Sequence, residues 1–517
     1  MKRLCFFFIF ACVVLHTLWS GNGGDPLSGR IQIEKKKNTI YELLNYIGDV
    51  SGYYFIYDSK IIDNEKKSQT KSGTYSIREA IFQVLKSENY TLRAVDRYIL
   101  INDKNSPAPQ PVHHSAVSKT KDSISYKNIS GVVLEKLSSE PIAYCSVSLE
   151  GTAIGTITNS NGKFLLRVPD SLNVEKLHVS HIGYESQRIP LTILENGSSN
   201  IYLSQRIIPL QEVIFRLVNP RKIVKEALDA RDHLYLDKPS YFTSFYREGI
   251  ERKKDLLKLT EAIFKVYKQS YTHSTADQVK LLKMRKITNN AVKDSLVLKM
   301  KAGVEASLML DLMKNIPDYL EINDKNIYDY TKIDMTEIDS RMAHVISFEQ
   351  RKGITEPYLR GKLYIDAENS ALLSAELEVH PSYIEKAEEL FVEKRGKNVK
   401  IHPQQIVYSV SYKELNGKYY MNHVRGDLYF KMKGKGQFFF NPMHIFFEMV
   451  TCKVDTNSVI PFPREERLPV KKIFSEENFS YDNNFWGDFN VILPEENINK
   501  NLSRITSKIE ESESKAL

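Results

Sequence analysis

Residues 129–203 read ISGVVLEKLSSEPIAYCSVSLEGTAIGTITNSNGKFLLRVPDSLNVEKLHVSHIGYESQRIPLTILENGSSNIYL, and this stretch decides the fold class. Short apolar alternations are separated by turn residues about every 8–12 positions, which predicts a small β-sandwich with one buried face per strand. The Asn159–Gly162 corner supplies residues suited to a tight hairpin turn. The expected inward positions are Ile129, Gly131, Val133, Ala143, Cys145, Val147, Leu149, Phe164, Leu166 and Val168.

The stretch resembles the carboxypeptidase regulatory-like (transthyretin-like) domains of Gram-negative envelope proteins. The resemblance implies a seven-stranded Ig/transthyretin-like sandwich over residues 128–205. It implies no proteolysis, because such domains accompany peptidases without carrying their catalytic residues. The matching residues are Ile129-x-Gly131-x-Val133, Pro141-Ile142-Ala143, Gly155-Thr156-x-Thr158, Asn161-Gly162-x-Phe164 and Ile182-Gly183-Tyr184.

A small α+β domain is predicted over residues 30–104. Thr39 can cap a first helix, and Ser76 with Glu79 matches a capping box for a second. The order of helix, strand, helix and hairpin resembles the secretin and TonB short N-terminal (STN) domain. In that family the domain lies in the periplasm and contacts other proteins. The rest of this chain departs from the family's pattern, so neither a transporter nor a secretin is implied.

Residues 215–517 predict a large antiparallel β-rich domain with a few helices. Asn219-Pro220 is typical of a helix start, residues 302–313 predict another helix, and Asn416-Gly417 predicts a hairpin. The alternation is similar to lipoprotein-carrier folds, in which an open half-barrel holds an acyl chain. One-sided spacing also predicts a terminal helix, through Ile498, Leu502, Ile505 and Ile509. The whole chain is therefore expected to be multidomain and β-dominated.

The start of the chain indicates export. Lys2 and Arg3 precede an apolar run followed by small residues, the layout of a secretory signal peptide over residues 1–24. The run is shorter than the ~20 residues of a membrane-spanning helix. Cys12 lies inside it, so lipidation there is the less favoured interpretation. Residues 105–127, rich in Pro, Ser and Lys, predict an extended linker.

Charge and cysteine content exclude two classes of protein. The net charge is +8, but 72 basic and 64 acidic residues are interspersed, whereas nucleic-acid binders concentrate their basic residues. Nucleic acid is therefore not an expected partner. Beyond the signal peptide only Cys145 and Cys452 remain, which does not make a disulfide scaffold. Cys145 shares its strand's inward parity and is expected to be a small buried hydrophobe.

No motif of known catalytic or metal-binding spacing occurs. His178 and His181 are three residues apart on one strand, which places them on opposite faces and favours structural roles. His113-His114 falls in the linker, where a defined metal site is not expected. Two sets of aromatic residues are expected to be buried on both faces of their sheets, although an exposed apolar face would mark a lipid or partner site. They are Tyr53-Tyr54-Phe55-x-Tyr57 and Phe438-Phe439-Phe440 with Phe446-Phe447. We therefore predict no catalytic, cofactor or metal residues, and the sequence identifies no ligand-binding residues.

These features predict a non-enzymatic, exported envelope protein in the periplasm or associated peripherally with the outer membrane. Its N-terminal domain would contact another envelope protein, the sandwich would act as a spacer, and the C-terminal domain would carry a binding surface. One alternative is a carrier of a lipid or other apolar ligand inside a half-barrel. A less favoured alternative is a hydrolase acting on glycan or peptide, for which acidic or histidine residues would have to converge from distant strands.

Overall fold

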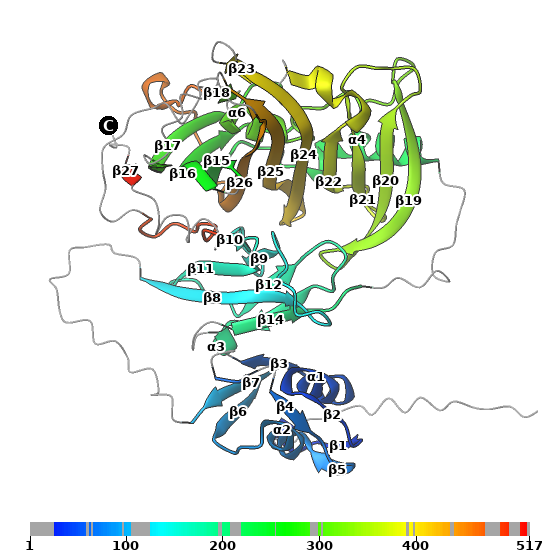
Figure 1. The fold of residues 1–517 in the computed structure, drawn as a ribbon, viewed down its shortest axis with the longest axis vertical. Helices are drawn as coiled ribbons and strands as arrows, with labels where there is room; N and C mark the ends of the chain where they lie inside the picture. Colours follow the sequence, from blue (N-terminus) through cyan, green and yellow to red (C-terminus); the bar gives the residue numbers. More distant parts are fainter. Residues whose placement is uncertain are drawn as a thin grey trace, which may run out of the picture. The chain divides into compact units, whose positions relative to one another are not determined.

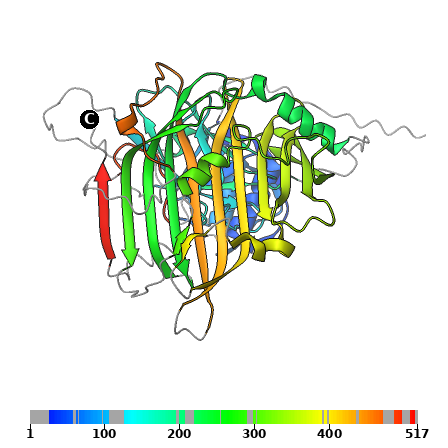
Figure 2. The same cartoon turned by 90° about the horizontal axis from the view of Figure 1, so that it is seen from above.

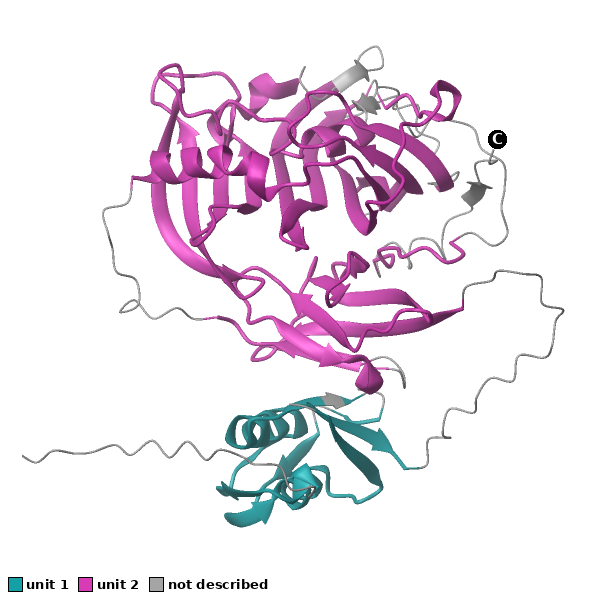
Figure 3. Cartoon of the chain, turned by 180° about the vertical axis from the view of Figure 1, so that it is seen from behind, with its two compact units in different colours: residues 1–107 teal, residues 108–517 magenta. Residues whose placement is uncertain are grey.

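The structure of the chain is a computed structural model that divides into two compact units, Met1–Pro107 and Ala108–Leu517 (Figure 3). The predicted signal peptide, His113-His114 and residues 498–506 of the predicted terminal helix lie outside the described residues. The structure describes residues 25–57, 61–63, 66–95, 98–104, 125–194, 199–206, 219–253, 255–289, 298–300, 303–388, 392–395, 399–434, 439–470, 486–495 and 507–513. Within these ranges, no helix has both the length and the apolar character needed to cross a bilayer.

Unit 1 has the α+β composition that its sequence predicts, with two helices packed on short strands around one apolar core (Figure 1). Thr39 Oγ1 accepts from the Glu42 N–H at 3.2 Å at the start of the first helix. The predicted capping box of Ser76 and Glu79 is present at the start of the second. The elements are η1 (Pro26–Ser28), β1 (Arg30–Ile33), β2 (Lys37–Thr39), α1 (Ile40–Ser51), β3 (Tyr54–Tyr57), β4 (Lys67–Gln69), β5 (Gly73–Ser76), α2 (Ile77–Leu85), β6 (Tyr90–Val95) and β7 (Tyr98–Asp103).

Unit 2 begins with the predicted seven-stranded sandwich. One sheet has the order β10-β9-β12-β13 and the other β11-β8-β14, in which β14 runs parallel to β8. The expected inward residues are buried, except Ala143, which is half-buried. The elements are β8 (Tyr126–Glu135), β9 (Ser146–Leu149), β10 (Gly155–Ile157), β11 (Lys163–Pro169), β12 (Lys176–Ser180), β13 (Gln187–Pro190), α3 (Leu191–Leu194) and β14 (Ser199–Leu203).

The Asn159–Gly162 corner does not form the predicted hairpin. It joins β10 to β11, which belong to different sheets, so the corner carries the chain across the sandwich. Of its residues only Gly162 has a positive φ, at 70°. The Gly162 N–H donates to the Asn159 carbonyl at 2.9 Å, which closes the turn through the backbone. Asn159 Oδ1 strengthens it by accepting the N–H groups of Asn161 and Lys163 at 3.0 and 2.9 Å.

The rest of unit 2 is built on an eleven-stranded sheet of order β19-β20-β21-β22-β24-β25-β26-β15-β16-β17-β27, with every pair antiparallel. The predicted hairpin forms at Asn416-Gly417, whose φ values are 52° and 76°. The strands are β15 (Ser240–Arg252), β16 (Asp255–Lys268), β17 (Gln278–Asn289), β19 (Tyr328–Ile338), β20 (Arg341–Gln350), β21 (Leu359–Asp366), β22 (Leu372–Val379), β24 (Lys400–Leu415), β25 (Lys418–Lys433), β26 (Asn441–Asp455) and β27 (Ser507–Glu513).

Helices cover one face of this sheet, which we name the helix face (Figure 2). Asn219 caps α4, as predicted, by accepting from the Arg221 N–H at 3.0 Å. Around the sheet lie α4 (Pro220–Asp229), α5 (Arg231–Leu234), α6 (Gly303–Met309), η2 (Pro381–Ala387), η3 (Arg464–Glu466) and the small sheet of β18 (Leu298–Met300) with β23 (Val392–Arg395).

The opposite face, which we name the sandwich face, lies against the sandwich (Figure 1). Neighbouring residues on one strand therefore enter different cores: Tyr246 packs under the helices, whereas Phe245 packs toward the sandwich. Phe446 and Phe447 are 3% and 7% exposed, as the expected burial on both sides requires. The expectation is wrong for the neighbouring aromatic run, because Phe439 and Phe440 are 83% and 38% exposed, and Phe438 lies outside the described residues.

The end of the chain differs from its prediction. Ser507–Glu513, which includes Ile509 of the expected terminal helix, is strand β27 and pairs with β17. Pairing at the sheet edge satisfies backbone groups that an exposed edge would leave open, and this long-range gain outweighs the local helical spacing.

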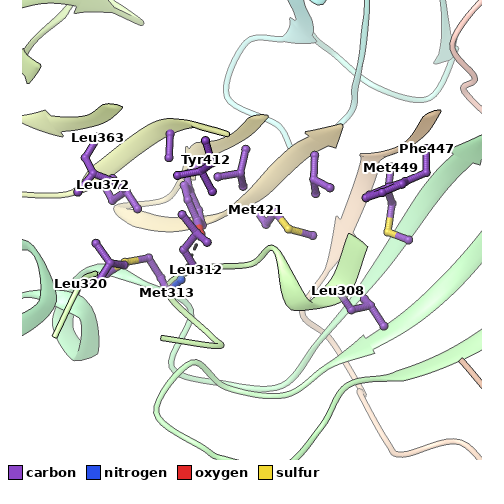
Figure 4. Packing of buried hydrophobic residues seen from close by; sticks show 14 of the residues in the cluster. Leu308, Leu312, Met313, Leu320, Leu363, Leu372, Tyr412, Met421, Phe447 and Met449 are labelled. Atoms are coloured by element: carbon purple, nitrogen blue, oxygen red, sulfur yellow. Dashed lines mark hydrogen bonds between the residues drawn. The ribbon is translucent and has the colours of Figure 1, made fainter. Parts of the chain in front are cut away.

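Side chains that follow α6 fill the described part of the helix face. Leu312 and Met313 pack against Tyr412 and Met421 of the sheet (Figure 4). Asp311 anchors this segment, because it accepts from Tyr412 Oη at 3.0 Å and lies 2.6 Å from the Lys268 ammonium.

We expect Leu312→Ala to lower the free energy of unfolding of unit 2 by about 2–5 kcal/mol, because the truncation leaves a cavity in a packed core. Met309→Ala is the matched control, since Met309 is 56% exposed and its truncation should change stability by less than about 0.5 kcal/mol. Denaturant unfolding followed by circular dichroism measures both; equal losses would contradict the packing described.

Candidate functional site

A row of charged residues crosses the sandwich face. Arg425, Glu448, Arg247, Glu261 and Arg285 stand directly opposite one another on β25, β26, β15, β16 and β17. The row therefore alternates in sign from strand to strand, and we name it the charge row. Cross-strand neighbours of opposite charge attract one another, so the residues fix the register in which these five strands pair.

The centre of the charge row is fully enclosed. Arg247, Glu261 and Glu448 are each 1% exposed. Arg247 Nε donates to Glu261 Oε1 at 2.8 Å, and its Nη1 donates to Glu448 Oε1 at 3.1 Å. Burial alone would raise the pKa of Glu448, but a nearby histidine and the guanidinium groups of Arg425 and Arg247 lower it to about 2. The row is thus ionised and internally compensated.

Residues 486–495, which we name the strap, cover the charge row. Arg247 Nη2 donates to the Ile492 carbonyl at 2.7 Å. The Arg285 guanidinium lies 5.3 Å from the Trp486 ring centroid. The guanidinium of the central arginine is thereby shared between the sheet and the strap.

The strap is also hydrogen-bonded to the sandwich. Asn490 accepts from the Arg167 N–H at 2.6 Å and donates to the Arg167 carbonyl at 3.3 Å. Since β11 is an edge strand of its sheet, the Asn490 carboxamide caps that edge. Asn159 Nδ2 donates to the Pro494 carbonyl at 3.0 Å. The sandwich, strap and large sheet therefore lie within one compact unit, in which the sandwich is a packed layer.

His444 lies beyond the charge row on β26 and bridges two carboxylates. Its Nε2 is 2.8 Å from Asp427 Oδ1, and its Nδ1 is 3.1 Å from Glu251 Oε2. Burial alone would lower the pKa of His444, but these carboxylates raise it to about 9. An imidazolium that donates from both nitrogens has no free lone pair at neutral pH, so it is poorly suited to act as a general base.

Two neighbouring cavities lie between the sandwich and the sheet, with volumes of about 330 and 310 Å³. We name the pair the interdomain cleft. Both cavities are lined by Asp339, Leu373, Tyr412 and Lys413, so they adjoin at these four residues. Lys413 on β24 donates to the hydroxyls of Ser146 and Ser148, and so links the sheet to strand β9.

Several buried polar atoms that line the cleft have no hydrogen-bond partner among the described residues. They are Asp339 Oδ1, His178 Nε2 and His423 Nε2. His423 Nε2 lies 3.8 Å from Glu448 Oε2, beyond hydrogen-bond distance. Burial lowers the pKa values of Lys413 and His178 despite the nearby Asp339 carboxylate. Orphaned buried polar atoms are uncommon, and their convergence marks the cleft as a candidate ligand site.

The sequence singled out His178 and His181, and the structure places them in different cavities of the cleft. His178 lines the cavity of about 330 Å³ and His181 the one of about 310 Å³. His181 Nδ1 is 3.0 Å from the Ile182 carbonyl oxygen. Among the described residues no group of three or more His, Cys, Asp or Glu side chains is arranged to hold a metal ion.

Sequence reasoning missed both the charge row and the cleft. A signal for the row is present, because Arg247 shares its strand parity with the buried Phe245. The cleft has no local signal, since Lys413, Asp339 and His178 come from three separate strands or turns. Cys145 and Cys452 are buried and unpaired, and Cys145 is inward as predicted.

Comparison with known proteins identifies the sandwich. Residues 129–215 match the family model of the CarboxypepD_reg-like domain, which confirms the predicted identity of this part. No curated protein sequence matches the chain. A LolA superfamily protein from Nitrosomonas europaea aligns at 9% identity and a TM-score of 0.19, covering 48% of this chain and 96% of that one. P. aeruginosa FpvA bound to heterologous pyoverdine aligns at 8% identity and a TM-score of 0.13, covering 78% and 57%. Such TM-scores carry no conclusion about this chain.

We expect Glu448→Gln to lower the free energy of unfolding by about 3–5 kcal/mol, because it leaves two buried guanidinium groups without their shared carboxylate. Glu349→Gln is the control: its side chain is 59% exposed and its pair with Arg360 spans 3.8 Å, so the change should be below about 1 kcal/mol. Urea titration of both variants checks this, and a Glu448→Gln protein as stable as the control would refute the structural role of the row.

The His444 bridge predicts a pH dependence. The pKa of this histidine is raised from 6.5 to about 9 in the folded protein, so the folded state binds the proton more tightly than the unfolded state. Its contribution to stability is therefore complete below about pH 6.5 and is lost as pH rises through about 9. Unfolding measured from pH 6 to 10 should show this loss, and His444→Gln should flatten it. A loss of the same size in His444→Gln would assign it to other groups.

Proposed function

We propose that this chain is a non-enzymatic, exported protein of the cell envelope that makes protein–protein contacts. Unit 1 would dock to an envelope partner, and unit 2 would present a second binding surface as one packed body. We place the protein in the periplasm, with peripheral association with the outer membrane. The observation that carries the proposal is the division of the chain into a small unit with its own core and a larger body built around a regulatory-like sandwich.

The electrostatics of unit 2 support a binding role over catalysis. Arg247, Glu261 and Glu448 at the centre of the charge row are held in ion pairs, and His444 is held as a cation between two carboxylates. A general acid or base needs a pKa near the working pH and access to substrate, and neither the charge row nor His444 meets both needs. The hydrolase interpretation gains no support from these groups.

Unit 1 carries a groove suited to a protein partner. It has a volume of about 580 Å³ and lies along α2 and β5. Its lining combines aromatic and charged side chains, the mixture found at protein interfaces: Tyr75, Glu79, Phe82, Gln83, Lys86, Ser87 and Glu88. Among the described strands β5 pairs with β1 alone, and Tyr75 of β5 lines the groove, so the second edge of β5 adjoins the same region.

The alternative function, in which the C-terminal domain carries a lipid or other apolar ligand, remains a prediction. The described side chains of the helix face pack on one another around Leu312, Met313 and Tyr412 (Figure 4). No observation on this face favours a bound lipid over this packing.

Photo-crosslinking tests the docking role. A photoreactive residue replacing half-buried Phe82 in the groove of the full chain should capture one discrete envelope protein in the native organism. The same residue at exposed Arg93 on β6, outside that groove, is the control and should capture it poorly. Equal capture at both positions, or none above background, would refute docking through unit 1.

A further inference from the structure

We propose that the interdomain cleft binds a small zwitterion of the amino-acid type, with its carboxylate at Lys413 and its ammonium group at Asp339. This site lies entirely within unit 2 and is independent of the docking proposed for unit 1. The ligand would contact both the sandwich and the large sheet.

The hydrogen bonds of Lys413 favour a ligand that carries an anionic group. Its ammonium donates to the Ser146 and Ser148 hydroxyls and makes no ion pair with a described carboxylate. An ammonium group has three donors, so one remains for a ligand. A cation in a site that burial has partly stripped of water is favourable only when opposite charge or further hydrogen bonds compensate it.

The position of Asp339 favours a ligand that carries a hydrogen-bond donor. Ile338 pairs with Arg341, so Asp339 and Ser340 form a two-residue turn, with φ values of 52° and 63°. Aspartate tolerates this left-handed conformation, and the turn directs its side chain into the cleft. Asp339 Oδ1 is buried without a hydrogen-bond partner among the described residues. A ligand ammonium group would supply both the missing donor and the opposite charge.

The other charged residues of the larger cavity are already paired. Arg188 Nε lies 2.7 Å from Glu150 Oε1. Arg341 contacts Asp366 at 3.2 Å and Glu414 at 2.7 Å. In the smaller cavity Glu376 lies 3.7 Å from the Lys362 ammonium. The cleft therefore offers one cation, Lys413, and one anion, Asp339, that lack ion-pair partners among the described residues.

Charge balance selects the class of ligand. An anion would match Lys413 but repel the Asp339 carboxylate, and a cation would do the reverse. A neutral polyol could hydrogen-bond to the serine hydroxyls, but it would give neither Lys413 nor Asp339 an ion-pair partner. A molecule that carries both charges satisfies both residues. His178 Nε2, which lacks a partner in the same cavity, adds one further polar contact.

Titration calorimetry of the full chain without its signal segment tests the proposal. The probes are the twenty common L-amino acids, with glucose as the polyol. At least one amino acid should bind, and it should bind more tightly than glucose. Its N-acetyl derivative, which lacks the ammonium group, and its amide, which lacks the carboxylate, should each bind about tenfold more weakly or worse. Lack of binding by every amino acid, or binding of either derivative as tight as that of its parent amino acid, overturns the proposal.

Variants then assign the two charges. Lys413→Met and Asp339→Asn keep the size of each side chain and should each weaken binding about tenfold or more. Lys418→Met is the control, because Lys418 pairs with Asp237 and does not line the cleft. Unchanged affinity in both cleft variants overturns the site. If a variant fails to fold, the derivatives measured on the unmodified chain decide the matter. Crosslinking at Phe82 should be unaffected by either variant, which separates this test from the docking test.

Discussion

The pairing of Arg247 with Glu448 and Glu261 is the constraint on which unit 2 depends. Three fully buried charges are tolerable only when each has partners at hydrogen-bond distance, and these partners come from neighbouring strands and from the strap. The register of the central strands, the seating of residues 486–495 and the packing of the sandwich are therefore coupled through one guanidinium group. The contact between the sandwich and the large sheet therefore resembles a domain core more than a flexible joint.

Buried charges on the sandwich face fall into two groups, which differ in whether they are paired. Over β25, β26 and β15 every buried charge is matched by a close neighbour, which gives rigidity. Over β22 and β24 two cavities lie between the sheet and the sandwich, and Lys413 and Asp339 line them without ion-pair partners among the described residues. Tightly compensated residues hold the two layers together, and this lets the adjacent hollow keep uncompensated polar groups, as binding sites commonly do.

Local features of the fold could be predicted, because they depend on neighbours in the sequence. Asn219 capped its helix, Asn416-Gly417 formed its hairpin, and the period of two identified the sandwich core around Val147. Features that depend on residues far away in the sequence could not be predicted. Ile509 lies in a strand because β27 pairs with the edge strand β17. Asn159 turns between two sheets because the strands on either side of it, β10 and β11, pair with strands of different sheets. The cleft residues meet only after the sandwich docks, so no spacing in the sequence marks them.

The position of β15 beside β26 has a consequence for how the molecule is made. Tyr241 pairs with Asp455, so the seam in the middle of the sheet joins chain segments that are synthesised far apart in time. Until residue 455 is available, the edge of β15 that will pair with β26 exposes open backbone groups, and Arg247 still lacks Glu448. Such an edge invites pairing with foreign strands, and non-local closure is slow.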